Sequence, residues 1–303
     1  MNELVKLGEK TFCLLNAVNV GFYIINENDV CLIDSGSGKD YVKNINKVLE
    51  SNNWNLKYII NTHSHADHIY GNQKLQDKYG CKIYCSEIEN SFINYPILEP
   101  TLFYGAMPIE DLKNRFLNAP KSVCEDIAKI NLDGIEIIDL KGHSPNMIGI
   151  LTSDNVLFCG DAFTSKSIIE KYQIQYIFDI QEYKNTLEKI SNMKYSYIVP
   201  SHGVIEKDAT NTIDVNLKIC NAIEMQVLDF LEKENTFESL LEKVFEYYHI
   251  NMNVTQYFLI SSTIKAYLKI LNDKGLISFD VVDNKLIIKK FNNFWKLVFY
   301  VFF

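Results

Sequence analysis

The most constraining feature of this sequence is a dense group of metal-ligand side chains, with His63, His65, Asp67 and His68 falling within six residues. The group directly follows residues 58–60, a short apolar run typical of a buried strand. Neutral imidazole and carboxylate are common ligands for zinc and similar ions. Neither a regular helix nor a regular strand points all four side chains at one place. The group therefore predicts a metal site in a strand-to-helix turn.

Three more candidate ligands lie just past other predicted strands. They are His143 and His202, both next to small residues, and Asp161 after an apolar run. Alone, each histidine would be interpreted as structural, and the Gly-Asp pair as a turn. Loops at strand ends over a rigid sheet normally build functional sites. Because the group at 63–68 already indicates a metal site, we expect all three residues to belong to the same site. The sixth histidine, His249, follows a predicted helix and is interpreted as a surface or packing residue.

The first two thirds of the chain alternate β-rich runs with amphipathic helices. Such an order, with continuous apolar strands, is typical of helices that cover a sheet, so we expect an α/β fold. The predicted strands are 12–15, 20–25, 30–33, 58–60, 82–85, 134–140, 147–152, 156–159 and 197–200, and the predicted helices are 39–52, 69–79 and 182–191. Residues 86–130 lack this alternation and carry four prolines, which indicates an insertion or helical lid.

The last third of the chain is mostly helical. Its predicted helices are 216–233, 237–248 and 262–272, followed by strands 276–282 and 285–290. Helix, helix, helix, hairpin is the order of a winged-helix module. We therefore expect a catalytic domain, residues 1–210, and a helical, winged-helix-like domain, residues 211–303. The apolar tail, residues 294–303, is too short to span a bilayer and is interpreted as a final strand or a docked terminus.

The order of these motifs resembles the metallo-β-lactamase fold superfamily over about residues 5–205. The resemblance implies an αββα sandwich. It places His63, His65 and His143 on one metal ion, and Asp67, His68 and His202 on another, with Asp161 bridging the two. Asp34, after the strand 30–33, matches a motif whose carboxylate orients a ligand histidine.

The resemblance also implies a mechanism. A hydroxide shared between two divalent ions would be the nucleophile, because metal binding lowers the pKa of water toward 7. Asp67 would be the catalytic residue that orients or deprotonates this water. Zinc is the expected ion, although iron or manganese also suits a site without thiolate. The expected reaction is hydrolysis of a small ester, thioester or lactone.

Three details narrow the choice of subgroup within this superfamily. Antibiotic-degrading members often use a cysteine or lack the bridging aspartate, so Asp161 makes the chain more similar to glyoxalase II, lactonase and ribonuclease relatives. Asn146 stands where many relatives have glycine, beside the expected substrate site. Residues 266–277 resemble the winged-helix end of the β-lactamase-like-protein-2 group, some of which cleave single-stranded RNA.

A nuclease or phosphodiesterase acting on single-stranded RNA or DNA is therefore the alternative function. A regulatory protein with a vestigial metal site and an iron oxygenase are weaker alternatives.

The charge and the cysteine content limit which kinds of partner and which cellular compartment we expect. The net charge is −8, and Arg115 is the single arginine among 30 basic residues. This disfavours a surface built for nucleic acid and favours a small-molecule substrate. Seven cysteines without a CxxC pair, and a start without a secretory signal, predict a cytoplasmic protein. No apolar run reaches the roughly 18–20 residues of a membrane span. A homodimer is the default oligomer.

Overall fold

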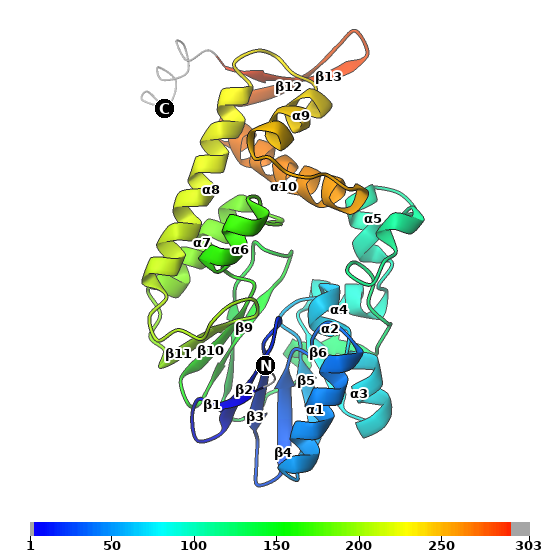
Figure 1. The fold of residues 1–303 in the computed structure, drawn as a ribbon, viewed down its shortest axis with the longest axis vertical. Coiled ribbons are helices and arrows are strands. Elements are labelled where there is room, and N and C mark those ends of the chain that lie inside the picture. The colour runs from blue at the N-terminus through cyan, green and yellow to red at the C-terminus, as the bar shows by residue number, and fades with distance from the viewer. Residues whose placement is uncertain (1–2, 292–303) are drawn as a thin grey trace.

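Two β-sheets and the helices on their outer faces make up most of the structure (Figure 1), a computed structural model that describes residues 3–291. The first sheet follows chain order and consists of β1 (Glu3–Lys6), β2 (Thr11–Leu15), β3 (Val20–Ile24), β4 (Asp29–Ile33), β5 (Asn55–Ile60), β6 (Lys82–Cys85) and β7 (Cys124–Asp126). The second has the order β11 (Tyr197–Pro200), β10 (Val156–Gly160), β9 (Ile148–Thr152) and β8 (Ile135–Asp139). The predicted α/β fold is confirmed.

Three apolar layers hold the sandwich together. The inner layer lies between the sheets and joins residues such as Ile60 of β5 to Phe158 of β10. The outer face of the first sheet packs on α1 (Lys39–Ser51) and α3 (Asn72–Tyr79). The outer face of the second sheet packs on α7 (Ile180–Ser191) and α8 (Thr210–Phe230). Helix, sheet, sheet, helix is the αββα order that the family resemblance implies.

Strand direction brings the loops that carry the candidate ligands to one edge of the sandwich. β4 and β5 run parallel, so their carboxyl ends meet. β10 runs parallel to β11, and β8 and β10 are both antiparallel to β9, so these three strands end at one edge of the second sheet. The two edges also touch, since the N–H of Ile148 donates to the carbonyl of Thr62 at 2.9 Å.

The C-terminal part contains three long helices and a hairpin, as predicted. After α8 come α9 (Phe237–Tyr247), α10 (Val254–Asp273), β12 (Ile277–Val282) and β13 (Lys285–Lys290). α10 begins before the predicted start at residue 262, because the side chain of Asn253 caps it by accepting from the N–H of Gln256. One apolar cluster runs from Ile138 to Ile288 across residue 210. The domain division there and the winged-helix assignment stay predictions.

Three local features differ from expectation. The predicted helix 69–79 is two helices, α2 (Ala66–Ile69) and α3, separated at Gly71, where a Cβ would lie 2.5 Å from the carbonyl oxygen of Ser35. The interval 86–130 holds α4 (Glu87–Asn94), α5 (Leu98–Tyr104) and two 3-10 turns, Glu110–Leu112 and Ile127–Lys129, but also β7, which is too short to show periodicity. The segment after Asp161 forms an unpredicted helix, α6 (Lys166–Tyr172).

Two sequence expectations concern membranes and thiols. Among residues 3–291, no helix is both long and apolar enough to cross a membrane. The tail 294–303, predicted as a strand or docked terminus, lies outside the described residues. All seven cysteines are free thiols with buried side chains.

A carboxylate joins the N-terminal strands to the turn between β9 and β10. Asp154 accepts from the N–H groups of Glu9 and Lys10, at 3.1 and 2.8 Å, and from the hydroxyl of Thr11 at 2.7 Å. Partial burial opposes ionisation, but these hydrogen bonds outweigh it and lower the pKa of Asp154. The ionised carboxylate therefore stabilises the contact between the two sheets.

We expect Asp154→Ala to lower the free energy of unfolding by about 1–2 kcal/mol at pH 7, less than for a buried carboxylate because solvent reaches this one. The folded-state pKa lies below the unfolded one, so the contribution is complete above about pH 4 and declines as the pH falls. Urea titrations at pH 7 and pH 3 measure both effects. The exposed Asp133→Ala variant is the control, and equal losses in the two variants would contradict the assignment.

Candidate metal centre

The ligand group predicted at 63–68 occupies the turn between β5 and α2. His63 lies three residues past the end of β5, and His65 has extended backbone angles, φ −61° and ψ 143°, at the start of α2. Asp67 and His68 belong to the single turn of α2. This change from strand to helix within a few residues lets side chains that would otherwise diverge face the same side.

The second sheet supplies the remaining predicted residues. His143 follows β8, Asp161 follows β10 directly, and His202 follows β11. Gly142 has a φ of 121°, and a Cβ on it would lie 2.2 Å from the backbone nitrogen of Tyr183. Only glycine therefore allows the loop of His143 to approach α7 this closely.

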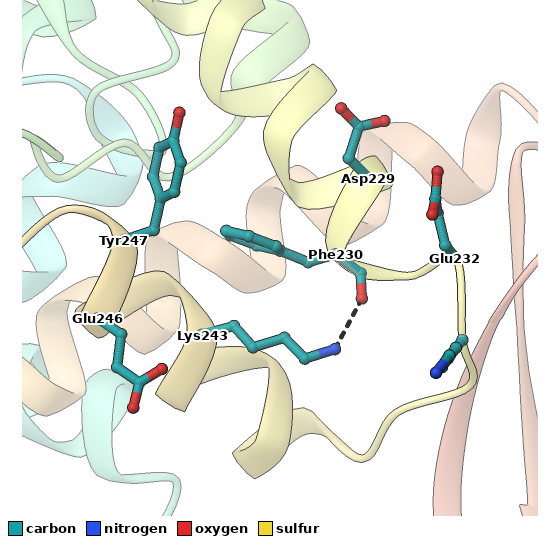
Figure 2. Close-up of a pocket in the computed structure, with 7 residues that line it drawn as sticks. Asp229, Phe230, Glu232, Lys243, Glu246 and Tyr247 are labelled. Carbon is teal, nitrogen blue, oxygen red and sulfur yellow. Dashed lines mark hydrogen bonds between the residues drawn. The ribbon is translucent and has the colours of Figure 1, made fainter.

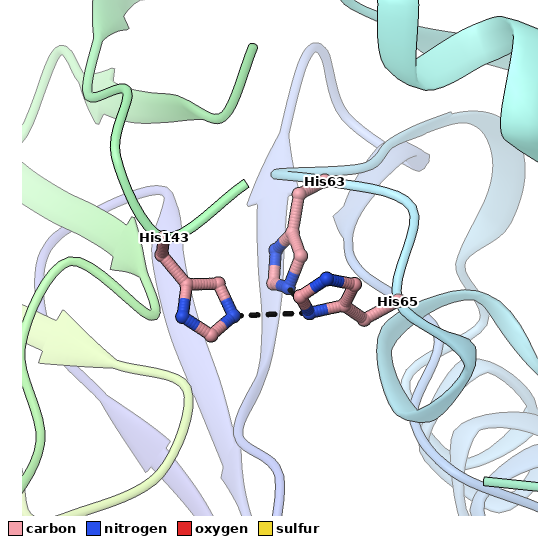
Figure 3. A group of neighbouring side chains, drawn as sticks. All are labelled: His63, His65 and His143. Carbon is pink, nitrogen blue, oxygen red and sulfur yellow. Dashed lines mark hydrogen bonds between the residues drawn. The ribbon is translucent and has the colours of Figure 1, made fainter. Parts of the chain in front are cut away.

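The predicted residues form two neighbouring triads. In the first, Nδ1 of His65 lies 3.1 Å from Nε2 of His63 and 3.0 Å from Nε2 of His143 (Figure 3). In the second, Nε2 of His202 lies 3.0 Å from a carboxylate oxygen of Asp67, and His68 completes the group. Within each triad, the potential ligand atoms lie within 4.8 Å of one another, close enough to hold a metal ion. Each triad takes two residues from the first sheet and one from the second.

Asp161 lies between the two triads. Its Oδ2 is 3.4 Å from Nε2 of His143 in the first triad. The same oxygen is 3.5 Å from Nε2 of His68 and 3.7 Å from Nε2 of His202 in the second. This is the position expected of a carboxylate that bridges two ions.

Hydrogen bonds on the far side of three imidazoles orient them. Nδ1 of His63 lies 3.0 Å from the hydroxyl of Thr62, and Nδ1 of His68 lies 3.0 Å from Asp34. Nδ1 of His202 lies 3.0 Å from the carbonyl of Ala17 and so carries a proton, because a carbonyl only accepts. In each case Nε2 faces the site, as in metal-binding histidines.

Asp34, which the family resemblance places beside a ligand histidine, lies next to His68. Besides contacting His68, its carboxylate accepts from the N–H and the hydroxyl of Thr62, both at 2.8 Å. Its φ of 61° is left-handed, which is uncommon outside glycine and costs on the order of 1 kcal/mol. Strain of this kind collects at functional sites. Its role in orienting a metal ligand stays a prediction.

The first triad is neutral. Burial, followed by repulsion from neighbouring imidazoles, holds the pKa of His63 well below its usual value and lowers the pKa of His65 to about 3. Burial also lowers the pKa of His143. Neutral imidazoles present the lone pair that a metal ion requires.

The second triad is charged in the absence of an ion. Burial opposes protonation of His68 and His202, but the carboxylates of Asp67 and Asp161 outweigh it. They raise the pKa of His68 well above its usual value and the pKa of His202 to about 9. The same imidazoles hold the pKa of both aspartates below the usual range, against the effect of burial.

Two buried atoms test whether a cation fits. Among residues 3–291, Nε2 of His68 and Oδ1 of Asp161 are buried without a hydrogen-bond partner. Buried polar atoms in proteins nearly always have a partner. A divalent ion would satisfy both, and the set of imidazoles and carboxylates suits zinc, iron or manganese. The residues present therefore fit a metal centre.

A cavity of about 790 Å³ opens onto this site. His143, Asp161 and His202 line one part of it, and Leu259 and Thr263 of α10 line another. His249 is exposed, as its interpretation as a surface residue expects, and it also lines the cavity. Sequence analysis did not place it at the cavity, because its neighbours in the chain carry no ligand-like spacing.

Tyr176 is a second lining residue that sequence analysis missed. Its ring lies 5.3 Å from the ring of His65 and 5.8 Å from that of His143. Phe103 of α5 contacts the same tyrosine at 5.3 Å. Tyr176 thus covers the first triad from the cavity side, although it lies in an irregular segment whose sequence shows no motif.

Another hollow, of about 540 Å³, lies between the end of α8 and α9 (Figure 2). Its lining includes Asp229, Glu232 and Glu246, and none of the predicted ligands. Lys243 donates to the carbonyl of Phe230 at 3.0 Å, which stabilises the carboxyl end of α8. The contacts of this hollow are structural.

The sequence relationships agree with this geometry. A sequence profile of the metallo-beta-lactamase superfamily matches residues 15–202. The chain belongs to the metallo-beta-lactamase superfamily. "Hydroxyacylglutathione hydrolase 1" of Vibrio vulnificus is 25% identical over 244 residues, 75% of this chain and 84% of that protein. "Hydroxyacylglutathione hydrolase" of Pelagibacter ubique is 40% identical over 67 residues, which span only 26% of its length.

Two further similarities bear on the predicted subgroup and fold. "Beta-lactamase-like protein 2 homolog" of Caenorhabditis elegans is 22% identical over 218 residues, 69% of this chain and 64% of that protein. A beta-lactamase domain protein from Burkholderia ambifaria superposes with a TM-score of 0.67 at 14% identity, covering 96% of this chain and 94% of that one. This metallo-beta-lactamase superfamily member is a metal-dependent hydrolase, as predicted.

Metal loading should release protons. At pH 7.5 His68 and His202 are protonated in the metal-free protein, and an ion at their Nε2 atoms requires the lone pairs, so we expect one proton from each. Zinc affinity should therefore rise with pH from 7 through about 9, the pKa of His202. Calorimetry in two buffers of different ionisation enthalpy measures the release.

The matched variants are His202→Gln and His249→Gln. We expect the first to release one proton fewer than wild type, because its amide does not titrate, and the second to release the same number. Zinc binding whose heat is independent of the buffer would contradict the predicted protonation of the second triad.

Proposed function

We propose that this protein is a dinuclear metal hydrolase of a small acyl compound, with a thioester as the first choice and an ester or lactone as the next. The observation that carries the proposal is the pair of ligand triads beneath one cavity, with Asp161 between them. Two divalent ions held there, zinc first, would polarise the scissile carbonyl and lower the pKa of water toward 7.

We assign a role to each candidate ligand from its charge and its exposure to solvent. The neutral His63, His65 and His143 would hold one ion, and Asp67, His68 and His202 the other. The Asp67 side chain is 31% exposed and that of Asp161 is 13% exposed, so Asp67 is the carboxylate that solvent water reaches more easily. Asp67 would therefore orient this water and accept its proton.

Cavity size and lining support a small substrate. A volume of about 790 Å³ lies within the range of roughly 300–1,000 Å³ that is usual for small-molecule sites. Leu259 and Ile260 offer apolar contact, while Lys171, Gln173 and Gln256 offer polar groups. This mixture suits an apolar acyl chain joined to a polar leaving group. The named activity of the Vibrio vulnificus relative is the reason for placing thioesters first.

The alternative, cleavage of single-stranded nucleic acid, has weaker support. The hairpin β12–β13 would be the wing that contacts phosphate, but acidic residues already pair with two of its three lysines, Lys289 and Lys290. Lys289 lies 3.6 Å from Glu234 and 3.4 Å from Asp280, and Lys290 lies 3.9 Å from Asp229. Binding of a phosphate backbone depends on uncompensated cations. The small-molecule reaction is therefore the better proposal.

The predicted cytoplasmic setting belongs to the same proposal. All seven cysteines are free, buried thiols. Disulfides form and persist in oxidising compartments, whereas thiols stay reduced in the cytosol. Seven free thiols therefore support a cytoplasmic setting.

A substrate panel tests the proposal. Zinc-loaded wild type, Asp161→Ala and the distant Asp229→Ala would be assayed on chromogenic thioesters, esters, lactones, phosphodiesters, a cephalosporin and single-stranded RNA. We expect hydrolysis of thioesters, with a loss of more than about 100-fold in Asp161→Ala, because even residues that only orient ligands contribute about 10–100-fold.

The Asp229→Ala variant should match wild type on every acyl substrate, since Asp229 lines the other hollow. Hydrolysis of RNA but not of any acyl compound would establish the alternative. Full activity and full metal content in Asp161→Ala would refute the site itself.

A further inference from the structure

Helix α4 begins the segment that the sequence predicts as an insertion or lid, yet one of its side chains lies deep in the protein. Glu89 is fully buried. Its Oε2 accepts from the N–H of Ser64 at 3.0 Å and from the hydroxyl of Ser64 at 2.5 Å. Ser64 lies between His63 and His65 in the chain. Glu89 therefore binds the loop of the first sheet that carries two residues of the first triad.

The other oxygen of the same carboxylate binds the loop of the second sheet that carries His143. Oε1 of Glu89 accepts from the hydroxyl of Ser144 at 2.7 Å and from the N–H of Asn146 at 2.8 Å. Ser144 directly follows His143. The hydroxyl of Ser86, at the start of α4, donates to the carbonyl of Asn146 at 2.5 Å and strengthens this attachment.

The partners of Glu89 are four neutral donors. Among residues 3–291, no lysine, arginine or histidine forms an ion pair with it, and its hydrogen-bond partners are Ser64, Ser144 and Asn146. Burying a carboxylate without a cation is unfavourable unless its lone pairs are fully used. Two backbone N–H groups and two hydroxyls use both oxygens, which orders both loops around one rigid point.

We propose that Glu89 is a positioning residue that sets the separation of His63 and His65 from His143, and thereby the metal affinity of the first triad. The proposal rests on the metal-dependent function proposed above. In this proposal, α4 holds the two ligand loops at a fixed separation and does not act as a lid.

The chemistry requires a carboxylate at this position. Each oxygen accepts from one backbone N–H, at Ser64 or at Asn146, and neither donor can turn away. A glutamine in place of Glu89 presents one oxygen and one NH₂ group, so in either orientation its NH₂ faces a backbone N–H. One loop would lose its backbone contact and keep at most a hydrogen bond from the NH₂ to its serine hydroxyl, while the shape and volume of the side chain stay nearly the same.

The test compares Glu89→Gln with Glu87→Gln, an exposed glutamate on the same helix. Zinc affinity would be measured by competition with a chromogenic chelator, and the ligand geometry by the visible absorption of the cobalt-loaded protein. We expect Glu89→Gln to bind zinc about 10–100-fold more weakly, the usual effect of removing a group that orients ligands. Its cobalt spectrum should differ from wild type, and Glu87→Gln should match wild type in both measurements.

Stability measurements separate positioning from folding. Ser144→Ala removes one hydroxyl donor but keeps both backbone contacts, so its zinc affinity should fall between those of wild type and Glu89→Gln. Thermal unfolding of each metal-free variant monitors the fold. A Glu89→Gln protein with reduced stability but the cobalt spectrum and zinc affinity of wild type would overturn the proposal, as would one unchanged in all three.

The readouts also distinguish this proposal from the proposed function. Normal zinc binding by wild type and by Glu89→Gln would refute the role of Glu89 and leave the hydrolase intact. A wild type that binds neither zinc nor cobalt would refute the metal centre, and the positioning role with it.

Discussion

The burial of ionisable groups at the edge of two sheets is the constraint on which the rest of this structure depends. His63 and His68 are fully buried, and Asp34 is nearly so. An isolated charge in such a place is strongly unfavourable, so every buried group needs a partner of matching chemistry. The parallel strand pairs, the left-handed Asp34 and the glycine before His143 are all ways of bringing those partners within contact distance.

Much of the site is predictable because its ligands are local in sequence. Four candidate ligands occupy a single turn after β5, and three others each follow a strand, so strand direction alone places them at one edge. Asp34 follows the same rule. The chemistry of imidazole and carboxylate then identifies the purpose of the edge without any knowledge of distances.

The residues that sequence analysis missed act through long-range contacts. Glu89 has the spacing of an ordinary solvated helix face, and nothing near it in sequence announces that two serines and an asparagine will surround it. Tyr176 and His249 reach the cavity from irregular segments. β7 is a strand because β6 offers it a free edge, and its three residues show no period. Such features depend on packing, which local patterns do not record.

The C-terminal helices belong to the same apolar core as the second sheet. α10 lines the cavity with Leu259, Ile260 and Thr263, and its Phe258 contacts Tyr104 of α5. The cavity is therefore closed by residues on both sides of the predicted boundary at residue 210. In the proposed reaction, the helices would contact the substrate on one wall of the cavity, and the strand ends would supply the chemistry on the other.

Each triad draws two residues from the first sheet and one from the second. An ion in either triad would therefore cross-link the two halves of the sandwich, and its binding free energy would add to the free energy of folding. The lifetime of the folded protein in a cell would then depend on the supply of the metal. A shortage would be felt first as loss of the protein itself, and only afterwards as loss of its reaction.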